Sequence, residues 1–254
     1  MKILVTFAVE AEFAPWRRLR NLRETRRGAF AVFQTQIGRA SVDFVVTGMG
    51  LESGRRGAEA VMSAPYDFCI ASGFAGALKS DYAVGDVIVA RSVQQLGVPK
   101  TLESARALAN RAEQAGARSA DMLLTVDHVV GTHEERAQLA PFASVVDMES
   151  FAVLSAARDR RIPAVAIRAI SDSFDEEMPA GIHSMLDEKG RVDVVGVAKF
   201  VATRPSAVPA VIRLGRNSKA AAAALAHFLE SFIENISSSP DGWLAEDFQE
   251  VAAR

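Results

Sequence analysis

Short apolar runs alternate with amphipathic segments along most of the chain. Several runs are rich in β-branched residues and continuous rather than alternating, as in strands covered on both faces. We predict strands at residues 2–8, 30–37, 42–49, 67–74, 86–93, 123–130, 143–148 and 163–171. Helices are expected between them at residues 51–63, 101–116, 132–140 and 149–161, the third of which begins with a capping box of Thr132 and Glu135.

Strands that alternate with helices are typical of a three-layer α/β/α fold with a central mixed, mostly parallel sheet. The pattern changes after Asp175, where we expect a loop at residues 176–192 and helices at 193–203 and 206–236. The composition of residues 176–217 suits a lid, a lipid-facing groove or an interface, and the sequence does not choose between them.

The composition indicates one folded domain. The chain has 254 residues, of which 49% are hydrophobic, so residues 1–236 are expected to form a single domain, with residues 237–254 as a partly disordered tail. The net charge of −2 and the lack of a basic run argue against nucleic acid as a partner. Cys69 has no cysteine to pair with, and the four histidines lack metal-ligand spacing, so we expect no disulfide, no metal and a cytoplasmic protein.

Acidic residues follow three of the predicted strands. Glu12 follows the first strand, Asp147 and Glu149 follow the seventh, and Asp172 follows the eighth. Each acid alone is explained by a helix N-terminus or a turn. Because ligands of open α/β sheets bind at the carboxyl ends of the strands, the acids together predict a site at one edge of the sheet.

Five segments carry a resemblance to a known family. AVEAEF, SGFAGAL, VGDVIVA, VDMES and RAISDS occur in the order and spacing of the nucleoside phosphorylase/nucleosidase superfamily. Over residues 1–175 the chain most resembles the methylthioadenosine/S-adenosylhomocysteine nucleosidases. The segment RPSAVPAVIRLGRNSKAAAAAL is similar to the hopanoid-associated phosphorylase branch. The resemblance implies a purine nucleoside substrate, water or phosphate as acceptor, no cofactor, and a homodimer.

The resemblance also implies roles for the reacting groups. Asp172 matches the acid that protonates N7 of the leaving purine, with Ser171 orienting it, and such an acid needs a pKa raised by burial. Glu12 matches the acid that activates the attacking water. Two carboxyl groups with a water between them are the arrangement of inverting glycosidases.

Three further residues match the family's ribose site. Glu149 would hold the ribose hydroxyls, and Met148 would pack under the sugar. Arg168 matches an arginine that supports the acidic cluster, and we expect this fixed cation to keep Glu149 ionised. Asp147 is expected to be part of the scaffold.

The acceptor side departs from the family pattern. Gly73 belongs to the family's glycine turn, but Phe74 stands where the nucleosidases have serine, and the phosphorylases' phosphate ligands are missing. A phosphate dianion needs cations or several N–H donors. We therefore expect hydrolysis, with phosphorolysis as the alternative if other arginines bind phosphate. The candidates are Arg17, Arg18, Arg55 and Arg56, of which the last two are expected to be solvated.

The base side departs too. Val129, followed by Val130, stands where the nucleosidases stack a phenylalanine on adenine. Met49 aligns with the residue that lines the 5′ pocket, and Phe74 would add to it, so we expect a bulky apolar 5′ group.

A non-catalytic nucleoside-binding protein stays open as an alternative of another class. Gly48, Gly50 and Gly54 have a spacing one residue too long for a dinucleotide-binding turn.

Overall fold

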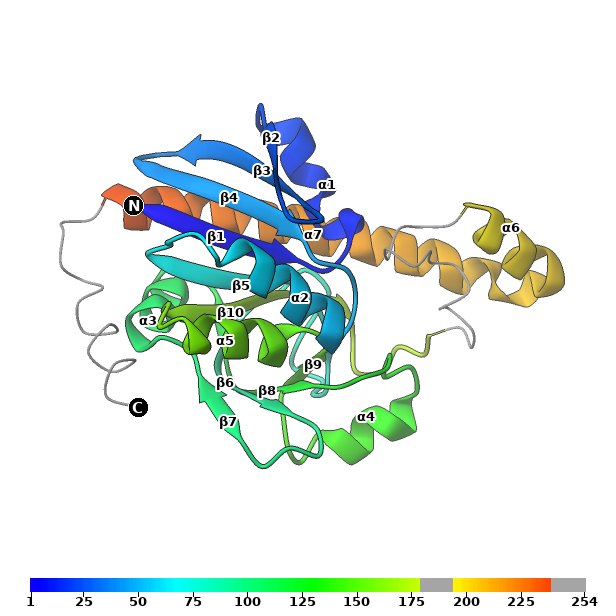
Figure 1. Ribbon diagram of the computed structural model, residues 1–254. Helices are drawn as coiled ribbons and strands as arrows, with labels where there is room; N and C mark the ends of the chain where they lie inside the picture. The colour runs from blue at the N-terminus through cyan, green and yellow to red at the C-terminus, as the bar shows by residue number, and fades with distance from the viewer. Residues whose placement is uncertain (179–193, 239–254) are drawn as a thin grey trace.

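The computed structural model describes residues 1–178 and 194–238, whose core is a ten-stranded mixed sheet (Figure 1). Five of these strands close into a ring, because β10 pairs with both β5 and β6 while β8 and β9 link β6 to β5. The strands are β1 (Lys2–Phe7), β2 (Arg23–Arg27), β3 (Phe30–Ile37), β4 (Ala40–Val46), β5 (Phe68–Ala77), β6 (Val87–Gln95), β7 (Thr101–Glu103), β8 (Arg118–Thr125), β9 (Val145–Asp147) and β10 (Ala164–Asp172).

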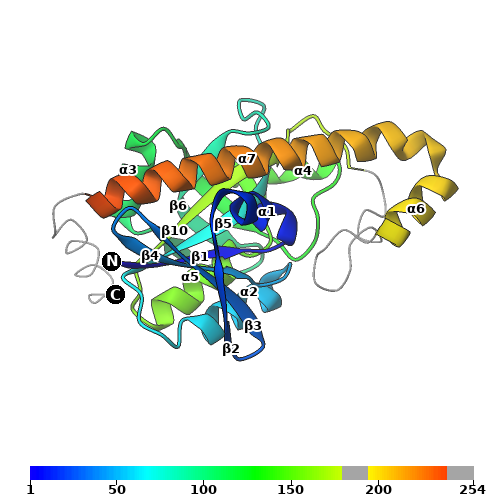
Figure 2. The ribbon, with the colours of Figure 1, turned by 90° about the horizontal axis from the view of Figure 1, so that it is seen from above.

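Helices cover both faces of the sheet, so the expected three-layer α/β/α architecture is confirmed (Figure 2). Side chains of β1 alternate between the layers: Leu4 packs with the α2–α5 side, while Ile3 and Val5 pack with α1, α3 and α7. The helices are α1 (Glu10–Leu19), α2 (Leu51–Val61), α3 (Arg106–Gln114), α4 (His133–Leu139), α5 (Ser150–Asp159), α6 (Val194–Thr203) and α7 (Val208–Ser238), with a 3₁₀ turn at Pro205–Ala207.

Parallel pairing brings several strand ends together. β1 is parallel to β4 and β5, and β5 is parallel to β10, so these strands share a carboxyl edge. The register sets Arg168 opposite Gly73 and Asp172 opposite Gly76, with an irregularity between Ile170 and Asp172. The acids that follow β1 and end β10 therefore lie at one edge of the sheet.

Helix α7 has two parts with different surroundings. Its second part packs on the sheet through Leu225, Leu229 and Phe232, which are buried. Its first part extends past the body of the molecule, where α6 folds back beside it (Figure 1). Among the described helices, none combines the length and the apolar character of a membrane span.

The structure corrects several expected elements. The helix expected at residues 101–116 is strand β7 followed by α3, because Leu102 pairs opposite Val93 and is buried. The charged strand β2, at Arg23–Arg27, was not expected, since as an edge strand it has no apolar face to recognise. Helix α7 continues to Ser238. Most of the expected loop at 176–192 and tail at 237–254 lies outside the described residues.

The start of α4 agrees with the sequence. The Thr132 hydroxyl accepts a hydrogen bond from the backbone N–H of Glu135 at 3.2 Å, which confirms the N-cap half of the expected capping box, whereas the Glu135 side chain contacts His128 instead of returning to Thr132. This cap satisfies one of the free N–H groups of the first turn. It starts a short helix beside the cavity described below.

Candidate active site

A largely apolar cavity of about 990 Å³ opens at the carboxyl edge of the sheet. The residues that the sequence assigned to a site converge on it from β5, α1, β10 and the loops after β4, β8 and β9. Those that line the cavity are Glu12, Met49, Phe74, Val129, Val130, Met148, Glu149, Ser171 and Asp172. Gly73 and Arg168 do not line it, but they contact residues that do.

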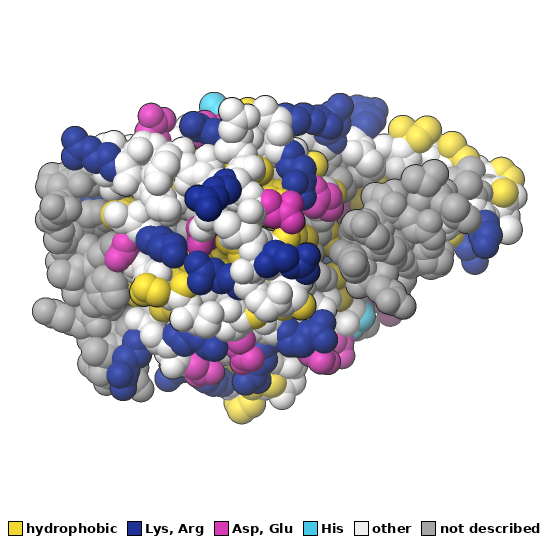
Figure 3. All heavy atoms as spheres, turned by 45° about the horizontal axis from the view of Figure 1, so that its top comes forward, with side chains coloured by type: hydrophobic (Ala, Val, Ile, Leu, Met, Phe, Trp, Pro, Cys, Tyr) yellow, Lys and Arg dark blue, Asp and Glu magenta, His cyan; other side chains and the backbone are white. Residues whose placement is uncertain are grey.

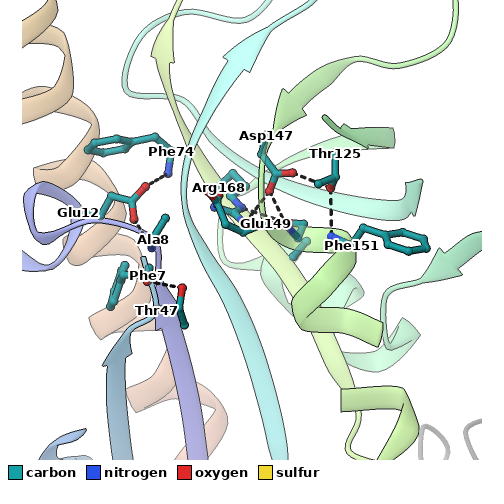
Figure 4. Close-up of polar contacts among 12 residues, drawn as sticks. Phe7, Ala8, Glu12, Thr47, Phe74, Thr125, Asp147, Glu149, Phe151 and Arg168 are labelled. Carbon is teal, nitrogen blue, oxygen red and sulfur yellow. Dashed lines mark hydrogen bonds and ion pairs between the residues drawn. The ribbon is translucent and has the colours of Figure 1, made fainter. Parts of the chain in front are cut away.

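Glu12 lies in the first turn of α1 and is only 3% exposed. Its Oε2 accepts hydrogen bonds from the backbone N–H groups of Ala8 and Val9 at 2.7 and 3.1 Å. Its Oε1 accepts one from Phe74 at 2.8 Å (Figure 4). Burial raises the pKa of Glu12, while Arg168 and the three N–H donors act in the opposite direction. The carboxyl group is thus held in place, with a pKa moved toward that of a base useful near neutral pH.

Gly73 allows Glu12 and Arg168 to approach each other. Its φ of 142° lies in a region that L residues rarely adopt. A Cβ at this position would lie 2.5 Å from Nη1 of Arg168 and 2.7 Å from Oε1 of Glu12. The structure places Gly73 inside strand β5 rather than in a turn, and its missing side chain leaves room for a cation beside the buried acid.

Arg168 is fixed by a buried network that includes Asp147. Its Nη2 lies 2.6 Å from Oδ2 of Asp147, and its Nε and Nη2 donate to the hydroxyl of Ser150. Asp147 also accepts hydrogen bonds from the Thr125 hydroxyl at 2.7 Å and the Ser150 backbone N–H at 3.0 Å (Figure 4). Asp147 also lines the cavity, but its carboxyl group is already held by Arg168, Thr125 and Ser150.

The pKa of Glu149 depends on more than its pairing with Arg168. Its Oε2 is 3.7 Å from Nη1 of Arg168, farther than Asp147 is, and its Oε1 accepts a hydrogen bond from Gly50 N–H at 2.8 Å. Burial raises the pKa of Glu149 to about 8, and the carboxyls of Asp147 and Glu12 add to the rise. Arg168 lowers this pKa but does not offset the burial, so the expectation that this cation keeps Glu149 ionised is not supported.

Asp172 ends β10 and is held by two side chains. The Ser171 hydroxyl donates to Oδ1 at 2.7 Å, as the orienting role of that serine requires. The Nη2 of Arg136 donates to Oδ2 at 2.6 Å. Burial raises the pKa of Asp172, and Arg136 and Ser171 oppose this rise. The carboxyl group is therefore both desolvated and paired with a cation.

Sequence reasoning missed Arg136. It lies on α4, its side chain is fully buried, and it also donates to the carbonyls of Ser173 at 2.6 Å and Val130 at 3.2 Å. The arginine thereby joins the end of β10 to the loop that carries Val130. Its neighbours in the sequence are polar, so the one available signal was its helical spacing from the partly buried Leu139.

The arginines considered for phosphate are mostly on the surface. Arg17 is exposed and pairs with Glu10, and Arg55 is exposed and pairs with Glu59 at 2.8 Å. Arg56 is exposed on α2, as the sequence predicted. Of these candidates Arg18 alone lines the cavity.

The fold and this edge of the sheet define a family. Residues 2–201 match the model of the phosphorylase superfamily, and the chain belongs to that superfamily. The resemblance that the five sequence segments carried is confirmed.

Solved structures give the same fold. A 5′-methylthioadenosine/S-adenosylhomocysteine nucleosidase from Neisseria meningitidis is 21% identical, with a TM-score of 0.71 over 92% of this chain and 99% of that one. Futalosine hydrolase of Helicobacter pylori is 18% identical, with a TM-score of 0.73 over 92% and 98%. An S-adenosylhomocysteine nucleosidase from Streptococcus pyogenes is 20% identical, with a TM-score of 0.70 over 93% and 97%. Together with the family match, these structures support an enzyme of the nucleosidase and nucleoside phosphorylase class.

Proposed function

We propose that the protein hydrolyses the N-ribosidic bond of a purine nucleoside that carries a bulky apolar 5′ group. The observation that carries the proposal is the convergence of Glu12, Glu149 and Asp172 on one cavity, which a fourth buried carboxyl group, that of Asp147, also lines. Burying charges is costly, and a fold has no need of three such groups facing a cavity unless a ligand uses them. Nucleosidases of known structure share the fold.

The proposed chemistry divides the work between two of these acids. Glu12 removes a proton from a water that adds to C1′ of the ribose as the bond from C1′ to the purine breaks. Asp172 supplies a proton to N7 of the leaving base, and Ser171 and Arg136 hold its carboxyl group. The products are a free purine and a free sugar. A general acid or base of this kind contributes roughly 10²–10⁴-fold to the rate.

Glu149 is proposed to hold the ribose. Because burial raises its pKa to about 8, its carboxyl group keeps a proton to higher pH than usual, and the protonated group can both donate to and accept from the ribose hydroxyls. Met148 lines the cavity beside it and supplies an apolar surface under the sugar. Arg168 is a positioning residue, since it contacts Glu149 and the scaffold acid Asp147.

The apolar lining of the cavity is the evidence for an apolar 5′ group on the substrate. Met49 and Phe74 line the cavity together with Val197, Val211 and Leu214 from α6 and α7. These side chains would cover apolar atoms but offer no hydrogen bonds to a hydroxylated substituent. Val129 and Val130 give the base a smaller apolar surface than an aromatic ring does.

Water is the favoured acceptor, because a buried acid at the acceptor position repels a phosphate dianion. Phosphorolysis is the alternative, and Arg18 is the observation in its favour, since it lines the same cavity. Product analysis separates the two. Free base and free sugar released without phosphate support hydrolysis, whereas base released only with phosphate, alongside a sugar 1-phosphate, contradicts it.

The catalytic roles are tested by Glu12→Gln and Asp172→Asn. Both substitutions keep the shape of the side chain, and each is expected to lower kcat by roughly 10²–10⁴-fold. Full activity of either variant contradicts its assigned role. If the unmodified protein binds nucleosides without turning them over, the non-catalytic alternative is correct.

A further inference from the structure

The arm that extends from the body is basic. We define the arm as residues Val194–Lys219, which comprise α6, the 3₁₀ turn and the first part of α7. The sequence from Val194 to Leu229 contains no Asp or Glu, although the chain as a whole has a net charge of −2. The arm therefore has a net positive charge, although it belongs to a slightly acidic chain. The basic residues of the arm, all exposed, are Lys199, Arg204, Arg213, Arg216 and Lys219.

The arm also presents apolar side chains to solvent. Ile212 is 58% exposed, and Val208 lies one turn before it, nearer the tip. Arg216 and Lys219 follow Ile212 at spacings of four and seven residues, so the three side chains share one face of α7. Figure 3 shows hydrophobic side chains along the end of the projection, with a basic side chain at its tip. Apolar and basic side chains therefore lie together on the arm, as on helices that bind at a bilayer surface.

We propose that the arm docks on an anionic lipid bilayer surface. Helices that lie at such interfaces combine exposed apolar residues with Lys and Arg. Each basic residue near an anionic membrane raises binding by about fivefold. The arm has five such residues, which give it a surface of the required positive sign. Among the ion pairs of the described residues, only Arg213 of these five has an acidic partner.

Two other occupants fit the arm less well. A second copy that met it through the same face would bring two sets of five positive charges together, which costs free energy. Nucleic acid would use the charges but leave Ile212 and Val208 without a role, since phosphates give apolar side chains no contact. A bilayer uses both properties.

Docking would bring the cavity to the membrane. Val197, Val211 and Leu214 belong to the arm and also line the cavity that holds Glu12 and Asp172. A nucleoside with a long apolar 5′ group partitions into membranes and would reach the cavity there without crossing water. This consequence rests on the proposed function, whereas the docking itself does not.

Sedimentation with lipid vesicles tests the docking. The full-length protein is mixed with phosphatidylcholine vesicles that contain or lack phosphatidylglycerol, and the bound fraction is measured without any nucleoside. We expect binding only when phosphatidylglycerol is present, and weaker binding as salt increases. The triple variant Lys199→Glu, Arg204→Glu, Arg216→Glu should bind at least about a hundredfold less.

A matched variant controls for net charge. Arg23, Arg26 and Arg56 are exposed on β2 and α2, and replacing all three with Glu changes the net charge by the same amount. We expect this control to keep vesicle binding. None of the six arginines and lysines lines the cavity, so both variants should keep the turnover of a short, soluble nucleoside.

Several outcomes overturn the docking. The first is equal binding to vesicles with and without phosphatidylglycerol, and the second is an equal loss of vesicle binding in the two triple variants. The third is an unmodified protein that binds no vesicles but forms a dimer, which dissociates only in the arm variant. Tight binding of a DNA or RNA duplex in place of vesicles also overturns it. Turnover is measured separately, so a failure of docking is not mistaken for a failure of the proposed function.

Discussion

The Nη2 of Arg136 lies 2.6 Å from Oδ2 of Asp172, and both side chains are buried, with Asp172 in the wall of the cavity. Burial and the arginine act on the acid in opposite directions, since burial raises the pKa of Asp172 and the cation lowers it. A general acid whose pKa is raised too far becomes a poor proton donor, and one that is not raised loses its proton at neutral pH. The pair sets the balance between these limits.

Replacing Arg136 with Met should therefore move the pH profile of the enzyme. The pKa of Asp172 rises further, so the protonated acid persists to higher pH. The alkaline limb of kcat/KM should shift upward by about one pH unit or more, the usual effect of losing an adjacent opposite charge. Arg136→Lys keeps the charge and should shift the limb less. Arg118→Met removes contacts with Asp81, Asp86 and the Tyr82 ring, none of which lines the cavity, and should not shift it. An unchanged limb in a folded Arg136→Met protein contradicts the role.

Glu149 should make the protein less stable as the pH rises. Between its ordinary pKa of 4.5 and about 8, the folded protein keeps a proton that the unfolded chain releases. The free energy of unfolding then falls with pH in this window, by up to about 1.4 kcal/mol per unit. Glu149→Gln cannot titrate and should have a smaller slope, since only Glu12 and Asp172, whose pKa values burial also raises, still contribute to it. Denaturant titrations from pH 5 to 9 would measure the difference. Glu134→Gln, at an exposed position of α4, should keep it. Parallel slopes in all three proteins would refute the assignment.

Gly73 should tolerate no side chain. Gly73→Ala combines an unfavourable φ with contacts of 2.5 Å to Arg168 and 2.7 Å to Glu12. Gly85 also has a positive φ, 92°, but a Cβ there meets no described atom within 4 Å, so Gly85→Ala isolates the backbone strain. We expect Gly85→Ala to cost about 1 kcal/mol and Gly73→Ala at least about 2 kcal/mol more, with loss of turnover. Equal unfolding free energies for the two variants would show that crowding at Gly73 is unimportant.

Phe74 should select for the apolar 5′ group. Phe74→Ser removes a half-buried ring and should lower kcat/KM for a 5′-alkylthio nucleoside by roughly tenfold relative to its 5′-methylthio analogue, because about 1–2 kcal/mol of apolar contact is lost. Phe142 is 71% exposed and does not line the cavity, so Phe142→Ser is the control. A ratio that stays constant while both rates fall would point to damaged folding rather than to lost selectivity.

The sequence by itself determined the class of fold and most of the site. Apolar runs separated by amphipathic segments predicted the layers, because the spacing of apolar side chains along the chain indicates which face of each helix or strand is buried. Glu12, Glu149 and Asp172 were found by their places after predicted strands, and parallel strands bring such places to one edge. The motifs around Gly73 and Met148 then supplied the family, which the match over residues 2–201 confirmed.

Only the tertiary structure decided how these groups are charged and held. Arg136 lies 36 residues from Asp172 in the chain, and their pairing depends on the closed ring of strands and the placement of α4. The sequence predicted an ionised Glu149, but burial raises its pKa to about 8, since Arg168 lies closer to Asp147. Desolvation and charge sharing depend on distances between residues far apart in sequence, and local patterns carry no information about those distances.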